Sequence, residues 1–89
     1  MSTDERPAPD LADDQVALVV EVFRMLADPT RVRLLWALTD AELSVSELAV
    51  AVGKAPSSVS QHLAKLRMSR LVRTRRDGTT IFYLSLIHI

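Results

Sequence analysis

Residues 44–84 read SVSELAVAVGKAPSSVSQHLAKLRMSRLVRTRRDGTTIFYL, and this stretch decides the fold. Ser44 and Glu47 have the spacing of a capping box, in which each side chain satisfies an unpaired backbone amide at a helix start. The apolar pattern that follows predicts a short helix over residues 45–52, which ends at Gly53. Pro56 then marks a first helical position, and the pattern predicts a second helix that continues to about Arg70. Two helices are therefore joined by a tight turn that contains glycine.

The rest of the stretch predicts a β-hairpin. Residues 71–76 and 79–84 are rich in β-branched and aromatic side chains, and Asp77-Gly78 is a favoured pair for a two-residue turn. With that turn, Arg76 would pair with Thr79 and Arg75 with Thr80. The pattern leaves open which face of the hairpin packs inward. A helix, a tight turn, a second helix and a hairpin predict a winged helix-turn-helix domain, mainly α with a β-hairpin wing, over residues 13–84.

Two more helices are predicted upstream. One begins at Asp13 or Asp14, after a tail that we expect to be mobile over residues 1–12. Its apolar residues form two rows at helical spacing: Val16, Val19, Val20, Phe23, Leu26 and Ala27 in the first, and Leu18, Val22 and Met25 in the second. One row would pack into the core of the domain, and the other would need a partner to cover it. We therefore expect a homodimer interface between Val16 and Leu26, with complete burial inside one chain as the alternative.

The second upstream helix begins after Asp28-Pro29, a cap followed by proline at the first helical position. Its apolar pattern covers residues 30–38. Residues 39–43 then read as a connector that leads into the capping box.

The helix predicted over residues 56–70 carries a face that suits a DNA groove. A rotation of about 100° per residue brings Val59, Leu63 and Leu66 together as the buried stripe. The other side is polar, and a glutamine there can pair with adenine at two points. No aspartate or glutamate occurs between Lys54 and Arg76. The expected DNA contacts are Lys54, Ser57, Ser58, Ser60, Gln61, His62 and Lys65, with Arg73, Arg75 and Arg76 in the wing. A merely polar, solvated helix is the alternative.

Charge is divided unevenly along the chain. The 89 residues carry no net charge, but residues 1–53 sum to −6 and residues 54–89 to +6. This division indicates a surface for a polyanion such as double-stranded DNA, with a solvated basic face as the alternative. The sequence contains no cysteine, no apolar run that could span a membrane and no signal-peptide pattern, so we expect a cytoplasmic protein that does not interact with membranes.

Several strings in this order resemble the ArsR/SmtB family of bacterial repressors. They are LADPTR at residues 26–31, SELA at 46–49, SSVSQHLAKL at 57–66, LVR at 71–73, RDG at 76–78 and FY at 82–83. The likeness covers about residues 14–84 and is strongest to nickel- and cobalt-sensing members from actinobacteria. It implies a dimeric winged-helix repressor that leaves an imperfect palindromic operator when a metal or another inducer binds. It also implies DNA contacts at Ser57, Ser60 and Gln61, and phosphate contacts at Lys65 and the wing arginines.

The chain departs from this family in its metal ligands. Members usually continue into a final helix that often carries His, Asp or Glu ligands, whereas residues 85–89 read SLIHI, an atypical or truncated C-terminus. The other family site uses cysteines near residues 44–48, and none occurs there. We therefore expect no cofactor in this chain, although similar full-length proteins would use nickel or cobalt. His88 would be at most a remnant ligand, and His62 a DNA or packing residue.

Two other classes of function compete with DNA binding. An enzyme is not expected, because the chain has no glycine-rich phosphate loop and its two histidines are far apart in sequence. A winged-helix module that binds protein without DNA is the more serious alternative. Such a module would bind duplex DNA weakly and without salt dependence.

Overall fold

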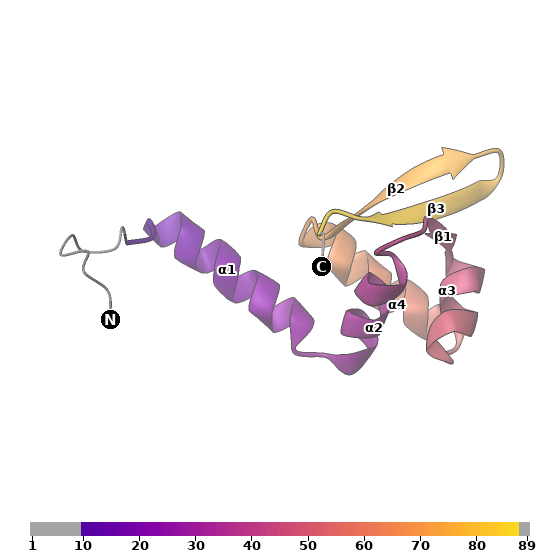
Figure 1. The fold of residues 1–89 in the computed structure, drawn as a ribbon, viewed down its shortest axis with the longest axis horizontal. Helices are drawn as coiled ribbons and strands as arrows, with labels where there is room; N and C mark the ends of the chain where they lie inside the picture. Colours follow the sequence, from indigo (N-terminus) through magenta and orange to yellow (C-terminus); the bar gives the residue numbers. More distant parts are fainter. Residues whose placement is uncertain (1–9, 88–89) are drawn as a thin grey trace.

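The computed structural model describes residues 10–87 and has the winged helix-turn-helix architecture that the sequence predicts (Figure 1). The elements in chain order are α1 (Asp13–Leu26), α2 (Pro29–Ala37), β1 (Leu43–Ser44), α3 (Val45–Val52), α4 (Pro56–Met68), β2 (Val72–Asp77) and β3 (Thr80–Ser85). The three strands form one antiparallel sheet in the order β1-β3-β2. Most of the predicted mobile tail and His88 lie outside the described residues.

A single apolar core holds α2, α3, α4 and the start of the wing together. Its eleven buried residues are Met25, Leu34, Leu35, Leu38, Leu48, Ala49, Val59, Leu63, Leu66, Leu71 and Val72. The predicted stripe on α4 is confirmed, because Val59, Leu63 and Leu66 are each 0% exposed. Half-buried Tyr83 packs against this core from β3. The core therefore fixes α4 from one side only and leaves the other side of that helix at the surface.

The predicted helix starts are confirmed by their caps. The Asp28 carboxylate accepts a hydrogen bond from the Arg31 amide at 3.0 Å, directly before Pro29. Ser44 and Glu47 form the reciprocal capping box, with distances of 3.0 and 3.3 Å between donor and acceptor. By contrast, Ala55 supplies no side-chain cap to α4, as expected for alanine.

The predicted end of α4 is wrong by two residues, because the helix stops at Met68 and Arg70 adopts a left-handed conformation with φ of +59°. The Leu71 amide donates to the Leu66 carbonyl and the Arg70 amide to the Arg67 carbonyl. This pair of bonds is a Schellman motif, which satisfies helix-end carbonyls and turns the chain into β2.

The predicted register of the hairpin is also wrong. Asp77 pairs with Thr80, Arg76 with Ile81 and Arg75 with Phe82, so Gly78 and Thr79 form the two-residue loop. A loop made of Asp77-Gly78 would need positive φ at both positions in its type I′ form, whereas here only Gly78 has it, at +61°. Glycine at the first loop position is what a type II′ turn requires. The pairing shifts by two positions, so the two faces keep the residues expected of them.

The sheet settles which face of the wing packs inward. Val72 is buried, Thr74 and Tyr83 are half-buried, and all three point to the helices. Arg73 and Arg75 lie on the outer face. The sheet also contains β1, a strand that the sequence did not predict. It comprises the last residue of the expected connector, Leu43, and the capping residue Ser44, and it pairs Leu43 with Tyr83.

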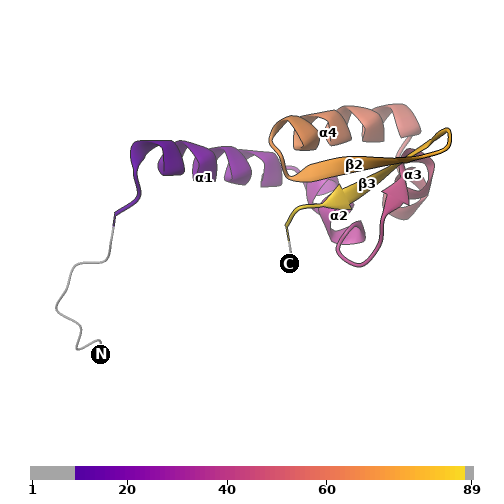
Figure 2. The same ribbon diagram turned by 90° about the horizontal axis from the view of Figure 1, so that it is seen from above.

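Helix α1 extends away from the rest of the domain as an arm (Figures 1 and 2). Only its last turns contact the core, through buried Met25 and half-buried Val22 and Leu26. The sequence did not indicate which apolar row serves the core. In the structure most of the first row is exposed, with Val19 at 40% and Phe23 at 68%, so complete burial inside one chain is wrong. At about 1.5 Å per residue, a helix of 14 residues is about 21 Å long and extends past the helices it would need to pack against.

Candidate nucleic-acid interface

The surface of α4 carries the polar face that the sequence predicts. Ser57, Ser60, Gln61 and Lys65 are exposed on the side opposite the buried stripe. Ser58 lies closer to the core and is half-buried, and Lys54 is exposed in the turn between α3 and α4. No carboxylate lies on α4 or on the turns at its two ends. This face can donate and accept hydrogen bonds without repelling phosphate.

Gly53 produces the tight turn that places α4. Its φ is +67°, and the amides of Gly53 and Lys54 donate to the Val50 and Ala49 carbonyls. No atom lies within 4 Å of the position a Cβ would take there, so only the backbone conformation demands glycine. The turn lets α3 pack on α4 through Leu48 and Ala49 and leaves the α4 face uncovered.

His62 lies on the flank of α4 and faces the corner between α1 and α2. Its Nδ1 is 3.4 Å from Arg31 Nη1 and 3.9 Å from Asp28 Oδ1, and its side chain is 21% exposed. Arg31 Nε also donates to the Met25 carbonyl at 2.8 Å. The same corner lowers the pKa of Asp28 from its ordinary value, first because the Arg31 amide donates to the carboxylate and then because of the Arg31 and His62 charges. This cluster joins α4 to the end of the α1 arm.

The wing carries its three arginines in different surroundings. Arg73 and Arg76 are exposed and form no ion pair with a described residue, while Arg75 contacts Glu42. Arg75 Nη2 lies 2.8 Å from Glu42 Oε2, and Arg75 Nε lies 3.2 Å from both carboxylate oxygens. The Arg75 guanidinium also lies over the Phe82 ring, 5.1 Å from its centroid. The hydrogen bonds between the two side chains lower the pKa of Glu42 and raise the pKa of Arg75.

Sequence reasoning missed Glu42. It lies in the segment expected to be a connector, 33 positions before Arg75, and neither residue type nor spacing links the two. Only the strand order brings them together, because β1 and β2 flank β3.

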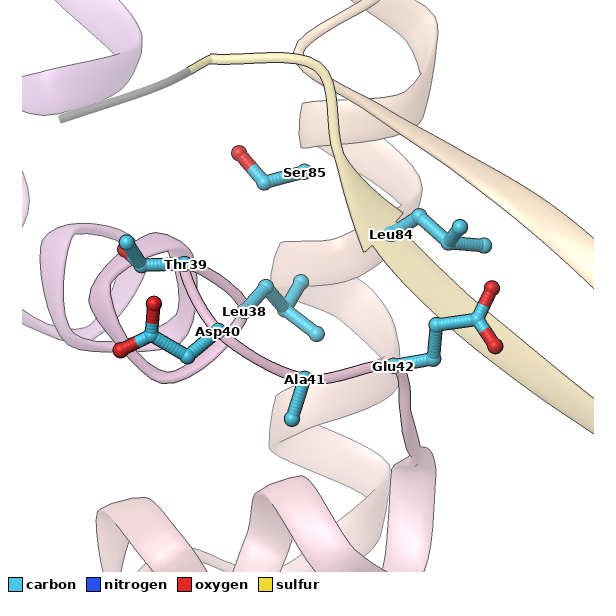
Figure 3. A pocket seen from close by; sticks show the side chains of 7 residues that line it. All are labelled: Leu38, Thr39, Asp40, Ala41, Glu42, Leu84 and Ser85. Atoms are coloured by element: carbon cyan, nitrogen blue, oxygen red, sulfur yellow. The ribbon is translucent and has the colours of Figure 1, made fainter.

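The described residues do not form a site that could bind a metal ion. No group of three His, Asp or Glu side chains that could hold one occurs within residues 10–87. His62, the one described histidine, lies beside the Arg31 cation, which opposes a bound metal ion. Asp40 and Glu42 line an open pocket of about 240 Å³ beside the connector, but their carboxylates point in different directions (Figure 3).

A search of residues 10–87 for a membrane-spanning helix finds none of sufficient length and hydrophobicity.

Comparison with known proteins places the helix-turn-helix in a family. Residues 28–74 match bacterial regulatory proteins of the arsR family. The HTH-type transcriptional regulator KmtR of Mycobacterium tuberculosis is 74% identical to this chain over 83 residues, which cover 93% of the chain and 63% of KmtR. The chain therefore spans less than two thirds of that relative's length.

Solved structures agree with the fold. The crystal structure of NolR from Sinorhizobium fredii matches with a TM-score of 0.77 and 36% identity, over 90% of this chain and 83% of NolR. The solution structure of the homodimeric winged helix-turn-helix DNA-binding domain of Mb0332 from Mycobacterium bovis, a possible ArsR-family regulator, matches with a TM-score of 0.75 and 30% identity. That match covers 88% of this chain and 75% of the fragment.

Proposed function

This chain belongs to the arsR family of bacterial regulatory proteins, and from that premise we propose that it is a homodimeric repressor that binds duplex DNA at an imperfect palindromic operator. Membership in this family confirms the resemblance seen in the sequence and separates the chain from enzymes. The observation that carries the proposal is the exposed face of α4, which holds no carboxylate while the opposite side of the helix is fully buried.

In this proposal α4 enters the major groove. Ser57, Ser60 and Gln61 lie on its exposed side, where they can reach base edges. Lys54 and Lys65, with Arg73 and Arg76 of the wing, would contact phosphates and fix the register of the helix on the duplex. Ser58 and His62 are half-buried, so their contribution would be to hold α4 in place beside any DNA contact.

The α1 arm supports the homodimer. Its exposed apolar side chains would otherwise remain in water, and the largest are Val16, Leu18, Val19, Val20 and Phe23. A second copy offers the same surface, so a twofold interface can cover both arms at once. A twofold dimer also requires two operator half-sites one helical turn apart, or a multiple of it.

Release from the operator by an inducer is part of the proposal, but no described residue is assigned to a nickel or cobalt ion. A regulator that acts on bacterial DNA works in the cytoplasm. Binding of another protein through the winged helix, without DNA, is the competing function that the experiment below distinguishes.

The proposal is tested by selecting duplexes from a random pool and comparing two variants on the selected operator and on random DNA. Gln61→Ala should cost about 1–3 kcal/mol on the operator and relax the preference at one position in each half-site, with little effect on random DNA. Lys65→Ala is the matched comparison and should weaken both duplexes alike. Failure to select any duplex would favour the protein-binding module, and equal losses for Gln61→Ala on both duplexes would exclude base reading by α4.

A further inference from the structure

Arg75 extends across the outer face of the sheet instead of pointing away from the wing. It lies on β2 opposite Phe82 on β3, and Phe82 lies opposite Ser44 on β1. Glu42 is two residues before Ser44, so the Arg75 side chain crosses β3 to reach the far edge of the sheet. The Phe82 ring lies beneath the guanidinium along this path. The Arg75 side chain therefore links β2 and β3 to the residue directly before β1, on the face that does not touch the core.

The contact occupies one forked edge of the Arg75 guanidinium, and such an edge would otherwise be able to bind a phosphate. Arginine recognises phosphate and carboxylate with the same fork of N–H donors. Glu42 already accepts from Nε and Nη2, which lie on one edge of the guanidinium. The same hydrogen bonds from Arg75 lower the pKa of Glu42 below its ordinary value. Together the two side chains carry no net charge.

We propose that Glu42 is an intramolecular substitute for a DNA phosphate at Arg75, and that it removes Arg75 from the set of cations that neutralise the DNA backbone. This assignment rests on the proposed DNA-binding function and specifies which wing residues serve it. Arg73 and Arg76 remain as the arginines of the wing that contact phosphate. Glu42 is a positioning residue, since it acts on DNA only through Arg75.

Salt dependence separates this arrangement from an ordinary phosphate contact. Each phosphate that a protein cation neutralises adds about −0.9 to the slope of log K against log salt. A paired Arg75 adds nothing while Glu42 remains bound to it, because the ion pair as a whole brings no net positive charge to the DNA backbone. Freeing Arg75 should therefore steepen the slope by about 0.9 per protomer.

The experiment compares Glu42→Gln with Asp40→Asn by salt titration on one duplex. Both substitutions remove one negative charge from the same connector, but Asp40 makes no ion pair with a described residue and its side chain points elsewhere (Figure 3). Exposed ion pairs contribute little to stability, so both variants should fold like the wild type. Glu42→Gln should steepen the slope by about 0.9 per protomer beyond Asp40→Asn. It should also bind about two- to fivefold more tightly per half-site at low salt.

A second variant tests the neutrality of the pair. Glu42→Gln combined with Arg75→Gln replaces the ion pair with two neutral amides, and it should keep the wild-type slope. A slope flatter than wild type by about 0.9 per protomer would show that Arg75 contacts phosphate in the wild-type protein and would overturn the assignment. Equal slopes for Glu42→Gln and Asp40→Asn would also overturn it. A wild-type slope near zero is a different failure, because it would remove the proposed function itself.

Discussion

Asp28 is the residue on which the corner between α1 and α2 depends. Its carboxylate caps α2 by accepting a hydrogen bond from the Arg31 amide. The Arg31 side chain in turn donates from Nε to the Met25 carbonyl. Asp28→Ala should lower the free energy of unfolding by about 1 kcal/mol, since an unsatisfied amide remains at the helix start. Asp28→Asn is the matched control, because asparagine caps as well as aspartate without the charge. Equal losses in urea denaturation for both variants would show that the charge, and not the cap, stabilises the corner.

The Asp28 carboxylate also makes the free energy of unfolding depend on pH in the acidic range. The pKa of Asp28 is lowered from its ordinary value of 3.8 in the folded protein, so the unfolded chain binds a proton more readily. Its contribution is fully present above about pH 5 and is lost as the pH falls through 3.8 and then through the folded pKa. Urea midpoints from pH 7 down to pH 3 should fall less in Asp28→Asn than in the wild type. An identical fall would contradict this role.

Sequence patterns predicted the residues whose partners are near in the chain. The Asp28 cap and the Ser44–Glu47 capping box join positions three apart, so their spacing alone identifies them. The Glu42–Arg75 contact joins positions 33 apart and depends on strand order, which no local pattern encodes. Of the candidate DNA contacts, the sequence identified the exposed face of α4 but not the partner that occupies Arg75.

At the scale of elements, two helix ends use the same left-handed conformation with different residues. Gly53 ends α3 at a φ of +67°, and Arg70 follows α4 at +59°. Glycine adopts this conformation readily, whereas a residue with a Cβ is strained there. Gly53→Ala should therefore destabilise the fold by about 1 kcal/mol, since no neighbouring atom blocks the new methyl group. Arg70→Gly relieves this strain but gives the unfolded chain more conformational freedom, so it should stabilise the fold by only a few tenths to about 1 kcal/mol. Thermal unfolding shifts of the same sign in both variants would contradict this account.

In the wing, the choice of turn residues decides how β2 and β3 pair. Asp77-Gly78 is a strong hairpin pair, but the chain uses Gly78-Thr79 as the loop, with positive φ at the glycine alone. Both arrangements place Val72, Thr74 and Tyr83 on one face, so the hydrophobic pattern does not distinguish them. The sequence therefore predicted the wing and its two faces, whereas the pairing itself depended on the turn geometry.

At the scale of the whole molecule, the α1 arm should control self-association. Phe23 is 68% exposed in the single chain, so its replacement should not disturb the monomer. Phe23→Ser should raise the dimer dissociation constant at least about tenfold, as expected if the dimer buries this large aromatic side chain. Val50 on α3 is 84% exposed, and Val50→Ser serves as the control that should leave association unchanged. Sedimentation equilibrium that gave both variants the same dissociation constant would place the interface elsewhere.

The central claim is that the acid-free face of α4 and the wing meet the backbone of duplex DNA in a dimer. The measurement that tests it most directly is the affinity of the wild-type chain for its selected duplex as a function of salt concentration. Three to five phosphates neutralised by each protomer predict a slope of log K against log salt between about −5 and −9 for the dimer. The duplex should contain two half-sites about 10 base pairs apart, or a multiple of that spacing. A slope near zero would contradict the claim.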